Sequence, residues 1–79
     1  MGVSIFLGNE DRASWTYSHF DYVLCQLGLP SAEESDWAGS MDPEHLVQNH
    51  HKIVNADDRE FIAEIAIESL RSGSSISWE

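Results

Sequence analysis

The chain has 79 residues, of which 14 are Asp or Glu and only 4 are Lys or Arg, so its formal net charge at pH 7 is −10. This length allows one domain, residues 1–79, and the 42% of hydrophobic residues allow it a core, so general disorder is excluded. A surface this negative repels phosphate backbones and anionic lipids, which excludes direct nucleic-acid and membrane binding, and it attracts basic proteins.

The N-terminal residues and the cysteine content favour a cytoplasmic protein. The apolar stretch 1–8 is too short for a signal peptide or a membrane span, and it lacks a basic leader. Cys25 is the only cysteine, so neither an internal disulfide nor a cysteine metal cluster is available. We therefore expect a cytoplasmic domain without a cofactor.

A β-hairpin is predicted at the start of the chain. Apolar residues alternate with their neighbours over 3–7 and again over 14–17, and the residues between these stretches favour a turn. Residues 75–78 alternate in the same way and are a candidate third strand, paired with the N-terminal one. The expected turn residues are Gly8, Asn9, Glu10 and Asp11.

A first helix is predicted over residues 19–27. Ser18 and Asp21 resemble a capping box at its start, and Gly28 suits the left-handed position after a helix end. Its apolar residues fall within an arc of about 100°, which gives the helix one buried side. These residues are Phe20, Val23, Leu24 and Leu27.

Residues 30–41 are predicted to form a loop, with one helical turn after Ser31. Asp42 and Pro43 then mark the start of a second helix, 43–54, because Asp is a good cap and Pro is favoured at the first helical position. The apolar side of this helix is expected to consist of Leu46, Val47, Ile53 and Val54.

Asn55 is expected to cap a third helix, 56–71, which ends before Gly73. The complete pattern predicts an α+β fold, in which a short antiparallel sheet packs against three helices.

Four carboxylates share one side of the predicted helix 56–71, within a sector of about 80°. Like charges four residues apart repel by about 0.2–0.5 kcal/mol per pair in an isolated helix, and Arg71 is the one cation that offsets them. Either this row is an ordinary solvated side, or it is a docking surface for a basic partner. The row consists of Asp57, Glu60, Glu64 and Glu68.

The rest of that helix is apolar over an arc of about 240°, which is wider than one core-facing side. The helix is then either central, clasped between the sheet and other helices, or it carries an edge for a homodimer or partner contact. The candidate edge consists of Ala63, Ile67 and Leu70.

Aromatic residues outside the core pattern are a further clue to binding. Trp37 lies among acids in the predicted loop, and Tyr22 points away from the apolar side of the first helix. Large aromatics of this kind are enriched at binding hot spots, although packing on the hairpin is the alternative. The candidate loop contacts are Glu33, Glu34, Asp36 and Trp37.

The histidines and the cysteine do not form a catalytic or metal-binding pattern. His45, His50 and His51 lack the spacing of three or four residues that places two ligands together on a helix. His50 is expected to be a partly buried, hydrogen-bonded residue of the core. A buried thiol is expected at Cys25, so a dyad with His19 or His50 is weakly motivated.

These observations predict a non-enzymatic, acidic protein-binding module, an inhibitor or adaptor that occludes a basic site of a partner protein or complex. Its size and acidity are similar to those of immunity proteins and phage-encoded inhibitors, but no motif carries that likeness. Three alternatives stay open: a DNA-mimic inhibitor, whose carboxylates imitate a phosphate backbone; a homo-oligomeric scaffold; and a small metal-binding protein.

Overall fold

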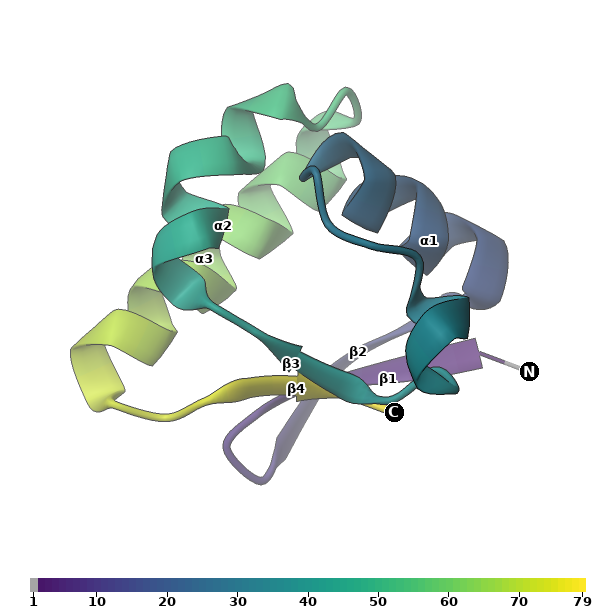
Figure 1. Ribbon diagram of the computed structural model, residues 1–79. Helices are drawn as coiled ribbons and strands as arrows, with labels where there is room; N and C mark the ends of the chain where they lie inside the picture. The colour runs from purple at the N-terminus through teal and green to yellow at the C-terminus, as the bar shows by residue number, and fades with distance from the viewer. Residues whose placement is uncertain (1) are drawn as a thin grey trace.

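A computed structural model describes residues 2–79 of the chain, and Figure 1 shows its two layers. One layer is a four-stranded antiparallel sheet with the strand order β2-β1-β4-β3. The other layer consists of the helices α1, α2 and α3, which lie on one side of the sheet. The predicted α+β fold is confirmed.

The hairpin consists of β1 (Gly2–Leu7) and β2 (Glu10–Thr16), so its turn is tighter than the predicted one. Gly8 has a positive φ of 60°, a conformation that glycine adopts without the steric cost that a side chain adds. The register runs from Ile5 opposite Ala13 to Phe6 opposite Asp11, which leaves Arg12 as the extra residue of a β-bulge.

The C-terminal strand β4 (Ile76–Trp78) confirms the predicted third strand and lies inside the sheet. It pairs with β1 on one side and with β3 (Gly39–Met41) on the other. Strand β3 falls in the segment predicted as loop. Its sequence, Gly-Ser-Met, carries no β-branched or aromatic residue. The extended conformation is therefore imposed by pairing with β4 and does not come from the local preference of these residues.

Helix α1 (Tyr17–Gln26) begins directly where β2 ends, earlier than predicted. Thr16 is its cap, because the Thr16 side chain accepts a hydrogen bond from the backbone N–H of His19. The predicted capping box of Ser18 and Asp21 is therefore wrong. Asp21 instead accepts hydrogen bonds from Ser31 Oγ and from the backbone N–H of Ala32, at 2.8 and 3.1 Å.

The predicted helical turn after Ser31 is confirmed as the 3-10 helix η1 (Ala32–Ser35). The second helix, α2 (Pro43–Asn49), starts as predicted with the Asp42 side chain as cap, but it is shorter than 43–54. A 3-10 turn, η2 (His50–Lys52), follows it, and the chain is extended at Ile53. Leu46 and Ile53 are buried, whereas Val47 and Val54 of the predicted apolar side are exposed.

Helix α3 (Ala56–Ser72) matches its prediction closely, with the Asn55 side chain as cap and Gly73 after its end. It packs against the sheet and against α2, and its buried side carries Ile62, Ile65 and Ala66. These residues join one hydrophobic cluster with Val3 and Ile5 of β1. Across residues 2–79, no helix combines the length and the apolar character needed to cross a bilayer.

Candidate functional site

The carboxylate row of α3 lies on the solvent side of the helix. Asp57, Glu60 and Glu64 are exposed, and the side chain of Glu68 is half-buried. Glu60, Glu64 and Glu68 follow one another at intervals of four residues, which corresponds to about 6 Å along a helix axis. The structure therefore brings the predicted row together as one ridge, which we call the α3 ridge (Asp57, Glu60, Glu64 and Glu68).

Arg12 of β2 neutralises the C-terminal end of the α3 ridge. Its Nη2 lies 2.6 Å from Glu68 Oε2, and its Nε lies 3.2 Å from Glu10 Oε1. The hydrogen bond to Glu68 raises the pKa of Arg12 above its ordinary value, and the negative charges of Glu68, Glu10 and Glu64 act in the same direction. Local sequence patterns do not predict this role of Arg12, because it depends on a β-bulge that no residue type marks.

The other three members of the α3 ridge form no ion pair within residues 2–79, although Arg71 lines the same shallow hollow as Glu64. Within residues 2–79, the ion pairs are those of Arg12 with Glu10 and Glu68 and that of His19 with Asp58, at 2.8 Å. Arg59, on the same helix, instead donates to the carbonyl oxygen of Ile53 at 3.1 Å. Asp57, Glu60 and Glu64 are therefore available to an external cation.

An exposed apolar strip runs beside the α3 ridge. Ile67 is 47% exposed and Leu70 is 49% exposed, while Ala63 is half-buried. Glu64 and Ile67 line the same shallow hollow. Part of the wide apolar arc is thus core, as a central helix requires, and the part at Ile67 and Leu70 is left on the surface.

The second predicted group of contacts lies on η1 and just after it. Glu33, Glu34 and Asp36 are exposed there. Trp37 is half-buried and stacks on Tyr17, with ring centroids 4.3 Å apart. Trp37 is therefore packed against the start of α1, directly after β2.

The structure separates the two acidic groups. The α3 ridge meets Arg12 of β2, whereas Glu34 lines a pocket beside β3, and these two strands are the opposite edges of the sheet. In Figure 1, the short turn after α1 lies at the right, and the C-terminal end of α3 lies at the left. The two groups are thus parts of two different surfaces.

Three of the histidines, His19, His45 and His50, have hydrogen-bond partners in this fold. His45 Nε2 donates to the carbonyl oxygen of Leu27 at 2.8 Å, and His50 Nδ1 donates to that of Val47 at 2.9 Å. His50 was predicted to be a partly buried, hydrogen-bonded residue of the core; it is partly buried and hydrogen-bonded, but it lies in η2 and outside the hydrophobic core. No group of three or more His, Cys, Asp or Glu side chains among residues 2–79 is arranged to hold a metal ion.

The prediction of a buried thiol is wrong, because Cys25 is exposed. The buried side of α1 consists of Phe20, Val23 and Leu24, and Cys25 lies just outside this side of the helix. Tyr22 is 59% exposed, as its position on the helix predicted.

Comparison of the chain with protein-family models, with curated proteins and with solved structures gives no match.

Proposed function

We propose that this protein is a non-enzymatic binding module that docks the outer side of α3 on a basic site of a partner protein. In that role it is an inhibitor or an adaptor, because occupying the basic site blocks or recruits the partner. The observation that carries the proposal is the exposed strip at Ile67 and Leu70, which lies beside carboxylates without ion-pair partners in residues 2–79. An apolar centre with a polar rim is the usual anatomy of a protein-protein interface.

Electrostatics supports a basic partner. Glu60 and Glu64 are like charges four residues apart, so this pair disfavours the helix by about 0.2–0.5 kcal/mol, whereas the charge of Glu68 is already offset by Arg12. A partner cation placed between them relieves this repulsion. The same charges steer a basic partner during diffusion, so association should be fast and sensitive to salt.

A second copy of this chain is a less suitable occupant of the same surface. Each copy has a formal net charge of −10, so two α3 ridges brought together repel over the Debye length of about 8–10 Å. The apolar strip alone must then overcome that repulsion. Homo-oligomerisation through Ala63, Ile67 and Leu70 therefore remains an outcome for the test below rather than the favoured function.

The DNA-mimic alternative is weakened by Arg12. A nucleic-acid strand presents an uninterrupted series of negative charges, whereas the Arg12 guanidinium neutralises the α3 ridge at Glu68. Three consecutive members of the ridge, Asp57, Glu60 and Glu64, keep their charge. This short series suits a small basic patch better than a nucleic-acid groove.

A cytoplasmic location is part of the proposal. Its support is the exposed thiol of Cys25, which persists unmodified most readily in a reducing compartment. A cytoplasmic extract is therefore the appropriate source of partners.

The test is capture from an extract of the source cells on immobilised protein, with elution by a salt gradient. The variant Glu60→Gln with Glu64→Gln removes two charges from the α3 ridge. The control Asp11→Asn with Glu79→Gln removes the same charge from exposed residues elsewhere. We expect one basic protein to be retained by the wild type and the control and lost by the ridge variant.

Three other results, two from this capture and one from sedimentation of the purified protein, would overturn the proposal. The first is that no protein is retained by the wild type. The second is equal retention by the ridge variant. The third is a stable dimer in sedimentation that buries Ile67, which would assign this surface to a second copy of the chain.

A further inference from the structure

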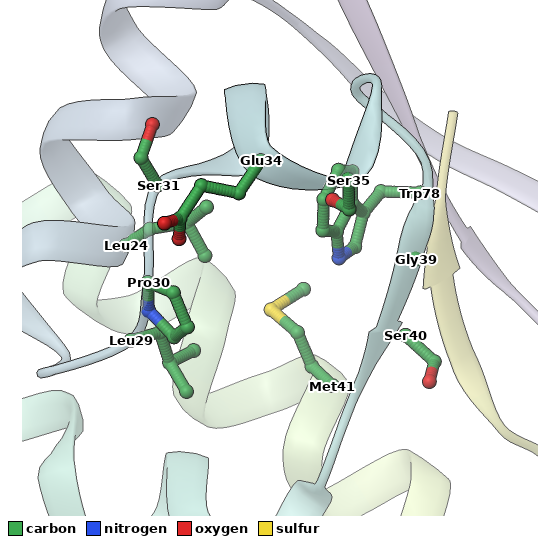
Figure 2. A pocket seen from close by; sticks show the side chains of 10 residues that line it. All are labelled: Leu24, Leu29, Pro30, Ser31, Glu34, Ser35, Gly39, Ser40, Met41 and Trp78. Carbon is green, nitrogen blue, oxygen red and sulfur yellow. The ribbon is translucent and has the colours of Figure 1, made fainter.

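A pocket of about 280 Å³ lies beside the edge strand β3, away from the α3 ridge. Its floor is apolar and buried, and is formed by Leu24, Met41 and Trp78. Its rim is exposed and includes Glu34 and the neighbouring segment of η1. Figure 2 shows the side chains of Met41 and Trp78 on one side of the space and those of Leu24, Leu29 and Pro30 on the other.

The floor of the pocket holds a buried donor. Trp78 is only 7% exposed, and its indole Nε1–H has no acceptor among residues 2–79. Figure 2 shows this nitrogen on the side of the ring that faces the pocket. Leaving a buried N–H unpaired is costly, so an acceptor on a ligand gains a hydrogen bond which the protein cannot make internally. Because this nitrogen has almost no accessible surface, the side chains that line the pocket must shift slightly to admit the acceptor.

The ring of Trp78 is held in this position by Gly39. A Cβ on Gly39 would lie 2.8 Å from Cζ2 of the indole, so only glycine allows β3 to approach the ring so closely. Trp78 is therefore fixed by backbone packing, and its donor is pre-positioned.

The open edge of β3 lies next to the pocket. Strand β3 pairs with β4 on one side only and is the last strand in the sheet order. Backbone groups on its free side are therefore available to an added strand. Such a strand would carry its side chains past the pocket mouth.

We propose that this pocket and edge bind an extended segment of a partner polypeptide. One apolar side chain fills the pocket, and a hydrogen-bond acceptor on the same segment accepts from Trp78 Nε1. A Lys or Arg beside the anchor faces Glu34 on the rim. This site is additional to the α3 ridge and does not depend on the function proposed for it.

The size and charge of the site determine the class of ligand. Small-molecule sites typically measure about 300–1,000 Å³, so a pocket of about 280 Å³ lies at the lower end of that range and also has room for one large side chain. Glu33, Glu34 and Asp36 are exposed around η1 and have no ion-pair partner in residues 2–79. They favour a segment in which basic residues flank the anchor.

The test uses a phage-displayed library of random short peptides against the immobilised protein. The pocket-blocking variant is Ser35→Phe, which places an aromatic ring on the exposed rim. The matched control is Ser14→Phe, which adds the same ring to an exposed serine on β2, the opposite edge of the sheet. We expect enriched peptides to carry an aromatic or aliphatic residue beside Lys or Arg. We expect their affinity to fall about tenfold or more with Ser35→Phe and to hold with Ser14→Phe.

A spectroscopic readout locates the bound peptide. In a ¹H–¹⁵N spectrum, the indole Nε1–H signal of Trp78 should shift on titration with an enriched peptide, while that of Trp15 should not. Glu34→Gln should lower the affinity for the peptide several-fold and leave the fold intact. This variant tests the contribution of the rim carboxylate independently of Ser35→Phe.

The inference is overturned if the wild-type protein enriches no peptide more strongly than the Ser35→Phe protein does. It is also overturned if the indole Nε1–H signal of Trp78 does not shift when an enriched peptide is added. It is also overturned if N-acetyltyrosinamide binds as tightly as the peptides, because the edge of β3 then contributes nothing and the site takes a small molecule. Loss of partner binding with Glu60→Gln and Glu64→Gln concerns only the α3 ridge, so the two proposals fail separately.

Discussion

Gly39 of β3 lies against the indole ring of Trp78 on the neighbouring strand, so closely that a Cβ on Gly39 would be 2.8 Å from the ring. The two residues are register partners, which fixes them opposite each other. This contact joins the edge strand to the hydrophobic core, because Trp78 also packs on Phe20 of α1, with ring centroids 4.9 Å apart.

Gly39→Ala should therefore destabilise the fold by about 1–3 kcal/mol, because the added methyl group displaces a buried ring. Urea unfolding monitored by fluorescence measures this change. Ser40→Ala is the matched control, since Ser40 is the next residue of the same strand and is exposed. This control should change the unfolding free energy by less than about 0.5 kcal/mol. Equal effects of the two substitutions would contradict the packing described here.

Asp21 anchors the segment that carries η1. Asp21→Ala removes the acceptor for Ser31 Oγ and for the backbone N–H of Ala32. The N–H of Ala32 is then left unpaired in a part-buried position. We expect a loss of about 1–3 kcal/mol in unfolding free energy. Amide exchange at Ala32 should accelerate relative to that at Ile62. Unchanged protection at Ala32 would show that the Asp21 contact does not hold this segment.

Two isoleucines on α3 should separate stability from binding. Ile62 is 1% exposed, so Ile62→Ala should cost about 2–5 kcal/mol in unfolding free energy. Ile67 is 47% exposed, so Ile67→Ala should change the unfolding free energy by less than about 0.5 kcal/mol, while it lowers the affinity for the captured partner. Calorimetric titration measures the second effect. Unaltered affinity with Ile67→Ala would remove the apolar strip from the interface.

Arg12 is predicted to limit the attraction of the α3 ridge for a basic partner. Arg12→Gln frees the Glu68 carboxylate and makes the ridge more negative. The association rate with the captured partner should rise by a factor of about 2 to 5 at low salt and should converge on the wild-type rate at high salt. A slower association would mean that Arg12 itself contacts the partner.

Local patterns were sufficient to predict the elements whose residues carry their own signals. The hairpin alternates, Asp42 and Pro43 mark the start of α2, and Asn55 and Gly73 bracket α3. The α3 ridge followed from helical periodicity alone, because its members lie on one helix.

The features that the sequence did not predict depend on contacts between distant segments. Strand β3 exists because β4 pairs with it, and its own residues have little strand preference. Arg12 reaches Glu68 through a bulge that no residue type marks. The pocket combines α1, η1, β3 and β4, so it appears only when the chain is folded.

The central claim is that the carboxylates of the α3 ridge attract the partner, and the association rate measured against ionic strength tests it most directly. Stopped-flow mixing of the captured partner with the wild type should give a rate that falls steeply as salt increases. With Glu60→Gln and Glu64→Gln, the low-salt rate should drop about tenfold and should depend less steeply on salt than the wild-type rate does, whereas Asp11→Asn with Glu79→Gln should keep most of the wild-type rate. Equal rates for the ridge variant and the wild type at every salt concentration would contradict the claim.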